Sequence, residues 1–239
     1  MKPRPLRRPL ALLLALVPLA GALSCELGPP PEVQLADASR QVTFASVELL
    51  GPHHYLSSVH RSDARPGRPE MVVDEVVEIS WQDWDRFQVR RLVDGEALRE
   101  TIVVDGVPWV RSADRWDRRD DAEPHRVQLR TTWNTWDEML GSVLNYIELV
   151  PDGDDIVEGR PASRYLVRLL TEEQAPRPKG YGFKPVSVEG KVWLDKATAV
   201  RLKAEVVAVT QRDALTRTIR LAEQRANIGE DQGVTAPPG

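Results

Sequence analysis

Segments that alternate apolar and polar residues, separated by tight turns, constrain the fold of this chain more than any other feature. In 200–209, Val, Leu and Ala fill the even positions, while Arg201, Lys203 and Glu205 fill odd ones. Successive side chains of a strand point to opposite faces, so this pattern predicts a strand with one buried and one wet face. Antiparallel sheets commonly have this arrangement.

Further segments of the same kind predict a sheet of many strands. The sequence IVVDGVPWV (102–110) is a hairpin signal, because Asp105-Gly106 accepts the positive φ angles of a tight turn. Pro108 there favours an edge or the start of a strand. The expected strands are 75–81, 86–90, 99–104, 107–111, 164–169, 191–195, 200–209 and 216–225.

One segment, 135–150, has helical periodicity. Its apolar stripe, which Trp133 extends backwards by one turn, consists of Trp136, Leu140, Val143, Leu144 and Ile147. Thr135 followed by Glu138 is typical of a capping box, and Pro151 with Gly153 predicts the end of the helix. A second helix over 32–50 competes with a strand over 42–47.

The first 24 residues have the order of a secretion signal: four cationic residues up to Arg8, an aliphatic run over 10–20, and small residues before Cys25. The alternative is a transmembrane helix. Pro18 and Gly21 interrupt the apolar run, which falls short of the ~20 residues that span a bilayer. We therefore expect a signal peptide at 1–24.

Cys25 has no partner for a disulfide within the chain, and its neighbours do not favour a buried structural cysteine. The sequence Ala22-Leu23-Ser24-Cys25 resembles a bacterial lipobox, with Ala22 where leucine is usual. The resemblance implies a covalent lipid on Cys25 that anchors the protein to a membrane. Three prolines at 29–31 predict a stiff tether over 25–34.

The charge and the length of the remaining chain restrict the partners and the number of domains to be expected. Residues 1–24 contain four cationic and no acidic side chains, so the remainder carries 28 Lys and Arg against 36 Asp and Glu, a formal charge of −8. A nucleic-acid-binding protein needs a basic surface, so no nucleic-acid partner is expected. Residues 35–239 suffice for one domain with a sizeable core.

No constellation of residues points to catalysis, so we do not expect an enzyme. The histidines of PHHYLSSVH (52–60) suggest a metal site or exposed loop and strand residues. Adjacent histidines on a strand point to opposite faces, which favours the second reading. Asp152 to Asp155 suggests calcium or a turn. The pattern lacks the flanking helices of a calcium loop, so a turn is preferred, and neither a metal nor another cofactor is expected.

The seven tryptophans are the unusual part of the composition. Wide indole rings fill a core well, but they can also line an apolar cavity between a curved sheet and a helix. The candidate lining residues are Trp81, Trp109, Trp133, Trp136, Leu140, Val143, Leu144, Ile147 and Trp193.

The chain resembles the envelope family that includes the lipoprotein carrier LolA, the lipoprotein receptor LolB and the stress regulator RseB. The resemblance rests on the strands over 75–111, on VEGRPASRYLVRL (157–169) and VEGKVWLDKATAVRLKAEVV (188–207), and on RANIGEDQGVTAPP (225–238). It implies an α+β, mainly β fold over 35–239: an incomplete antiparallel β-barrel, or curved sheet, covered by one to three helices. It also implies an apolar cavity that receives acyl chains.

From these features we expect an outer-membrane lipoprotein that faces the periplasm and carries or receives a lipid or an acylated lipoprotein. Glu26 after the cysteine is compatible with export to the outer membrane. The alternative is an interaction or signal-sensing module with a filled core, which contacts an envelope protein through loops such as 171–186. Fold likeness alone does not decide between them.

Overall fold

The computed structural model describes residues 44–171, 173 and 182–238, which form one eleven-stranded sheet in the order β6-β5-β4-β3-β2-β1-β11-β10-β9-β8-β7. All the strand pairs are antiparallel. The strands are β1 (His53–Ala64), β2 (Met71–Asp83), β3 (Arg86–Val93), β4 (Glu96–Val104), β5 (Val107–Ser112), β6 (Arg115–Arg118), β7 (Ile147–Val157), β8 (Arg160–Leu169), β9 (Lys184–Asp195), β10 (Arg201–Arg212) and β11 (Leu215–Ala226).

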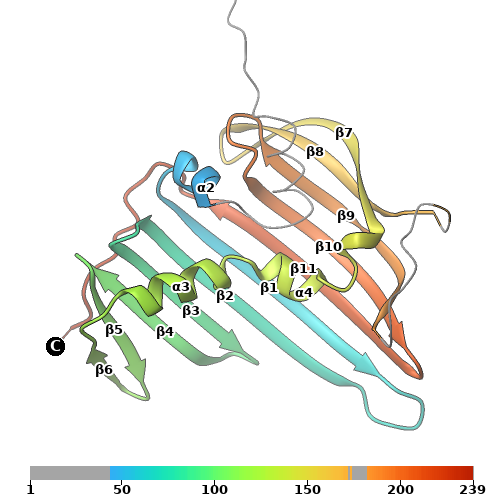
Figure 1. Ribbon diagram of the computed structural model, residues 1–239, viewed down its shortest axis with the longest axis horizontal. Coiled ribbons are helices and arrows are strands. Elements are labelled where there is room, and N and C mark those ends of the chain that lie inside the picture. The colour runs from blue at the N-terminus through green and yellow to red at the C-terminus, as the bar shows by residue number, and fades with distance from the viewer. Residues whose placement is uncertain (1–43, 172, 174–181, 239) are drawn as a thin grey trace, which may run out of the picture.

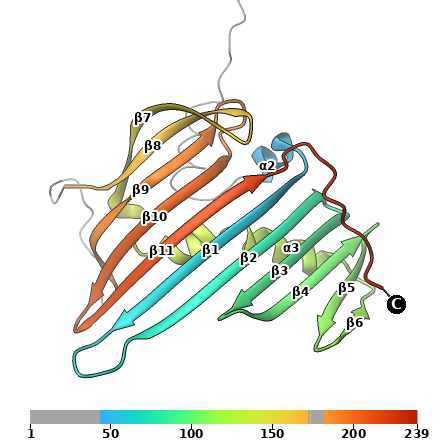
Figure 2. The same cartoon turned by 180° about the vertical axis from the view of Figure 1, so that it is seen from behind.

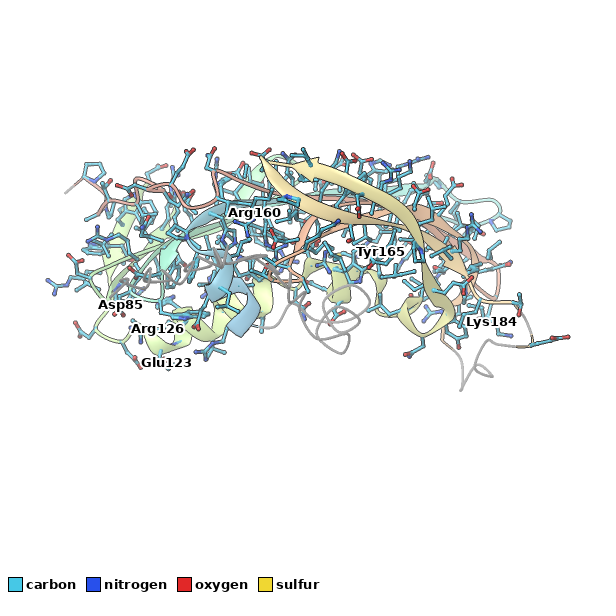
Figure 3. All side chains as sticks on the ribbon, turned by 90° about the horizontal axis from the view of Figure 1, so that it is seen from above. Asp85, Glu123, Arg126, Arg160, Tyr165 and Lys184 are labelled. Carbon is cyan, nitrogen blue, oxygen red and sulfur yellow. The ribbon has the colours of Figure 1, made fainter. Side chains whose placement is uncertain are left out.

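Within the described ranges, three short α-helices accompany the sheet: α2 (Phe44–Leu50), α3 (Glu123–Thr132) and α4 (Thr135–Leu140), with a 3-10 turn η1 (Leu144–Tyr146). Helices α3 and α4 lie across one face (Figure 1), and none of the helices that the structure describes covers the other (Figure 2). Seen from above, the sheet and these helices form two layers (Figure 3). The predicted fold class, a curved antiparallel sheet covered by one to three helices, is confirmed.

The alternation of side chains determines which residues face the helices. In β10, Ala204, Val206 and Ala208 are buried, and they pair across the strand with Glu223, Leu221 and Ile219 of β11. We call this side the helix-covered face and the opposite side the uncovered face. All eight predicted strands are present.

The helix predicted over 135–150 is wrong beyond Leu140. Helix α4 ends there, and Ile147 begins β7, which pairs with β8 from Ile147↔Leu169 onward. Pro151 and Gly153 do not end a helix; they lie inside β7, at an irregularity in the pairing between Pro151 and Asp154. Pairing along β8 therefore outweighs the helical periodicity of the sequence.

The predicted capping box is also absent. The residue before α4 is Asn134, without a side-chain capping bond, and the hydroxyl of Thr135 donates to the Thr132 carbonyl at 3.2 Å. The expected turn at 152–155 is instead part of β7. Helix α3 and strands β1, β6 and β7 were not predicted.

Several predictions fall partly or wholly on residues outside the described ranges. These are the signal peptide (1–24), the tether (25–34) with Cys25, and the first part of the possible helix over 32–50. Its last part, Phe44–Leu50, is helical. Of the predicted loop 171–186, Lys184–Val186 belongs to β9. Among the helices that the structure describes, none is long and apolar enough to cross a bilayer.

Candidate functional site

The helix-covered face carries two apolar clusters. The first lies under α4 and the start of β7, where Trp136, Leu140 and Val143 are fully buried and Ile147 is 8% exposed. Its sheet side consists of Val59, Val167, Val188, Val192, Leu194, Ala204, Val206, Ala208, Ile219 and Leu221. Leu144 is partly buried and packs against this cluster. Five of the nine predicted lining residues therefore come together here.

The second cluster is aromatic and lies beside the end of α3. The ring centroids of Trp81, Trp84 and Trp133 are 5.6 to 6.0 Å apart, and each pair of rings meets edge to face. His53 stacks on Trp133 at 5.9 Å. Such edge-to-face contacts add to the stabilisation that comes from burial. Trp81 and Trp133 are thus also buried on the predicted face.

A buried polar network lies at the boundary of the two clusters. Glu223 accepts hydrogen bonds from the Tyr55 hydroxyl at 2.8 Å and from Nε of Arg201 at 2.6 Å. The Arg201 guanidinium lies over the ring of Trp136 in the first cluster, 4.6 Å from its centroid. Arg225 lies over the ring of Tyr55 and donates to the Arg201 carbonyl. The network therefore joins β1, β10 and β11 to α4.

Burial shifts the pKa values of two members of this region. It raises the pKa of the Tyr55 phenol, and the negative charge of Glu223 adds to the effect, so Tyr55 stays protonated and donates. Burial lowers the pKa of His53 to about 3, helped by the positive charge of Arg225. His53 is therefore neutral in the folded protein, with Nδ1 2.8 Å from the Gly51 carbonyl.

Side-chain contacts hold the helices on the sheet. Arg126 of α3 binds Asp85 and Glu123 (Figure 3) and donates from Nε to the Trp84 carbonyl at 3.0 Å. Glu138 of α4 accepts from Nη2 of Arg91 in β3 at 3.1 Å.

Two predicted lining residues lie on the other side of the sheet. Trp109 pairs with Ile102 and is half-buried on the uncovered face. Trp193 pairs with Lys203 on the same face, where its indole donates to Asp155 at 3.0 Å and the Lys203 ammonium lies 4.9 Å from its ring centroid. The prediction that these two line a space under the helices is wrong, because each lies on the opposite side of its strand.

The uncovered face contains a groove of ≈ 650 Å³ that crosses β8, β9, β10, β11, β1 and β2. Ser58 and Ala222 are among its lining residues, and Glu205, Arg220 and His60 add charged or titratable groups of both signs. His60 is bonded to Asp74 at 2.7 Å. We call this feature the outer groove.

His53 and His54 lie on strand β1 and point to opposite faces, as predicted, but His53 is fully buried and not exposed. No group of three or more potential metal ligands occurs in the described ranges. The sequence analysis did not identify the charged residues that are buried in the core. Arg201 was placed on the wet face by alternation, but the pairing of β9 and β10 shifts between Arg201 and Lys203, and this bulge turns Arg201 inward. Glu223 and Arg225 continue the face of β11 on which Ile219 and Leu221 lie, so alternation could have identified them as inward-facing.

Two of the stretches that carried the family resemblance, 157–169 and 188–207, meet at one point. Arg160 of the Gly159-Arg160-Pro161 turn binds Asp195, which ends β9 and accepts from the amides of Ala197 and Thr198 at 2.8 Å. Burial alone would raise the pKa of Asp195, but the bonds from Arg160 and these amides outweigh it and lower the pKa. The motifs therefore stabilise a hairpin rather than a reaction site.

No protein-family model and no curated protein matches the chain. Among solved structures it is similar to LprF from Mycobacterium bovis, with 16% identity, a TM-score of 0.33, and coverage of 89% of this chain and 100% of the other. It is also similar to the lipoprotein LppX from Mycobacterium tuberculosis, with 12% identity, a TM-score of 0.27, and coverage of 81% and 94%.

A third similar structure is that of a LolA superfamily protein from Nitrosomonas europaea, with 9% identity, a TM-score of 0.26, and coverage of 78% and 91%. At these TM-scores the likeness says nothing about function, which has to be inferred from the residues of this chain.

Proposed function

We propose that this protein is a lipid-anchored protein of the bacterial envelope that binds an acyl chain between the sheet and helices α3 and α4. The observation that carries the proposal is the first apolar cluster, in which the α4 side chains Trp136 and Leu140 pack on an aliphatic sheet surface. An acyl chain can form the same apolar contacts with this surface.

The helices that cover this surface, α3 and α4, are short enough for a ligand to displace them. Helix α4 has six residues and α3 has ten, and helices of this length are not stable alone in water, so their order depends on packing against the sheet. Gly141 to Val143 then separates α4 from η1. A ligand that replaced the packing of α4 would move a short segment and leave the sheet pairing intact.

A ligand has to replace contacts that already exist, because Trp136, Leu140 and Val143 are fully buried. Each buried CH₂ group contributes about 0.8 kcal/mol, so a chain of a dozen carbons supplies enough apolar contact to compete. We therefore propose a long acyl chain, carried by a lipid or by an acylated protein, as the ligand.

The proposed location follows from the first 25 residues. A signal peptide ending before Cys25 and a lipid on that cysteine would hold the domain at a membrane, and Glu26 is compatible with the outer membrane, on the side that faces the periplasm. The protein would then carry or receive lipids or lipoproteins at the membrane surface.

The full burial of Trp136 and Leu140 also favours a second candidate, an interaction or sensing module with a permanently filled core. Such a protein would contact a partner in the envelope through its outer surface. The two candidates differ in whether α4 leaves the sheet when a lipid is offered.

Native mass spectrometry of the lipidated protein, purified from membranes, tests the proposal. We expect a non-covalent lipid adduct that disappears on unfolding, in addition to the covalent mass on Cys25. A protein that carries no adduct and takes up none from added phospholipid would contradict acyl-chain binding and favour the second candidate.

A further inference from the structure

Strands β1, β2, β10 and β11 extend past α4 at one end of the sheet (Figure 1). The strand pairing places three arginines at this end of the helix-covered face. Arg61 of β1 pairs with Ile219, and Arg217 of β11 pairs with Asp63, which places both arginines on the helix-covered face. Thr210 of β10 pairs with Arg217, and Arg212 lies two residues further along β10, so it is on the same face. We call this group the arginine end.

Two of these guanidinium groups are held in fixed positions. Arg217 donates from Nε and Nη2 to the two carboxylate oxygens of Asp63, each at 2.7 Å. The hydrogen bond from Arg217 lowers the pKa of Asp63, which therefore stays charged. The guanidinium carbons of Arg217 and Arg212 lie 4.5 and 4.8 Å from the ring centroid of Phe183.

The positive charge of the arginine end exceeds its negative charge. Asp63 is fully engaged by Arg217, whereas Arg61 is half-buried and makes no hydrogen bond or ion pair with any residue that the structure describes. Glu75, a nearby carboxylate on the same face, is bonded to Arg91 at 2.8 Å. The charge of Arg61 acts on Asp63, but both carboxylate oxygens of Asp63 are bonded to Arg217. The half-buried guanidinium of Arg61 therefore favours a further anion beside it.

A buried hydroxyl group faces the same place. Thr210 is fully buried, lies directly across the strand from Arg217, and its Oγ1 has no hydrogen-bond partner in the described part of the chain. Buried polar groups in proteins are nearly always bonded, so an unpartnered hydroxyl indicates a missing acceptor or donor. An oxyanion held by the arginines is such an acceptor.

There is room for a ligand at this end. A hollow of ≈ 660 Å³ is lined by Gly182, Lys184–Val186 and Gln211–Asp213. Arg212 lines this hollow, and its guanidinium lies over the ring of Phe183, as does that of Arg217. The shared contact with Phe183 links the hollow to Arg217. Lys184, at the end of the sheet seen on the right in Figure 3, also lines the hollow, but it pairs with Gln211 and so lies on the uncovered face, and Asp213 adds a carboxylate.

The arginine end borders the first apolar cluster. Val59 precedes Arg61 by two residues on the same face, and Ile219 lies opposite Arg61; both belong to that cluster. We propose that the arginine end binds the phosphate headgroup of an anionic lipid whose acyl chain lies in the first cluster. This inference rests on the proposed acyl-chain binding and names its ligand class. Guanidinium groups match the several acceptor oxygens of a phosphate better than a neutral headgroup.

The test compares phosphatidylglycerol with diacylglycerol of the same acyl chains, bound to the purified lipidated protein held in amphipol and measured by native mass spectrometry. We expect phosphatidylglycerol to bind about tenfold more tightly, as charge-assisted hydrogen bonds allow. Arg61→Gln should lower the affinity for phosphatidylglycerol by about tenfold and leave that for diacylglycerol unchanged. Because Arg61 has no bond to lose, its thermal unfolding should match the wild type.

The matched control is Arg220→Gln, because Arg220 lies on the neighbouring strand β11, opposite His60, and points to the uncovered face. It should leave both affinities unchanged. Equal binding of the two lipids, or equal losses from both substitutions, would overturn the headgroup site while acyl-chain binding stands. If neither lipid binds, both proposals fail. If free glycerol phosphate binds as tightly as the lipid, the ligand is a soluble phosphate and the lipid assignment is overturned.

Discussion

Nε of Arg201 lies 2.6 Å from the Glu223 carboxylate, and the two side chains are almost completely buried, at 0% and 1% exposure. With the Tyr55 hydroxyl, this ion pair ties β1, β10 and β11 together under α4. A buried charge that is paired and hydrogen-bonded is tolerated in a core. Removal of one partner leaves the other charge buried without compensation, which strongly lowers the stability of the fold.

Arg201→Met is therefore expected to lower the free energy of unfolding by about 3–5 kcal/mol, because it leaves a buried carboxylate with the Tyr55 hydroxyl as its remaining bond among the described residues. Chemical denaturation measures the change. The control is Lys203→Met, which breaks the exposed pair with Glu205 (2.8 Å) and should cost less than about 1 kcal/mol. Equal effects of the two changes would refute the role of burial.

Gly190 marks a position in β9 where no side chain fits. A Cβ there would lie 2.2 Å from the Glu205 carbonyl oxygen and 2.8 Å from the Cα of Val206, both of them backbone atoms that cannot move aside. Gly190→Ala should therefore distort the pairing of β9 with β10 and lower the melting temperature. Gly182→Ala is the control, because nothing lies within 4 Å of its Cβ position, and it should be neutral.

His53 predicts a pH dependence of stability. Its folded pKa is about 3, below the value of about 6.5 expected in the unfolded chain. Between these two pH values the unfolded chain binds a proton at His53 and the folded protein does not. The resulting stability is present above pH ~6.5 and is lost as the pH falls towards 3, at up to about 1.4 kcal/mol per pH unit.

Denaturation curves between pH 4 and 7 measure this slope. His53→Gln should reduce the slope by the equivalent of about one proton. An unaltered slope in His53→Gln would show that the imidazole is not held neutral by burial.

Leu140 contributes to the first cluster more than Leu144 does, because Leu140 is fully buried and Leu144 is partly exposed. Leu140→Ala should lower the free energy of unfolding by about 2–5 kcal/mol, and Leu144→Ala by clearly less. If added phospholipid restores the stability of Leu140→Ala, the ligand fills the space that the side chain vacates. Equal losses from the two substitutions would contradict the packing of α4 described here.

The strands could be predicted wherever alternation and turns agreed. In β10, Ala204, Val206 and Ala208 follow the pattern, and the Asp105-Gly106 turn joins β4 to β5 as expected. Strand β7 could not be predicted, because its first residue, Ile147, also fits a helical stripe; pairing with β8 decides its structure. Helix α3 has little apolar character, and of its ten residues only His125, Leu129 and Thr132 are buried.

The candidate site was predicted in part. The stripe from Trp136 to Ile147 does lie on the helix-covered face, because α4, η1 and the start of β7 keep it on one side despite the change of secondary structure. Trp109 and Trp193 could not be placed, because their face depends on strand register. Arg201 was misplaced because a bulge, which alternation cannot reveal, inverts its orientation.

Photo-crosslinking with a diazirine-labelled palmitate tests acyl-chain binding most directly. The lipidated protein is irradiated with the probe, digested, and the labelled residues are located by mass spectrometry. We predict labels on α4, within 135–140, and on the strand residues of the first apolar cluster. Labels confined to the outer groove, around Ser58 and Ala222, or no labelling above that of the unfolded protein, would contradict a ligand under the helices.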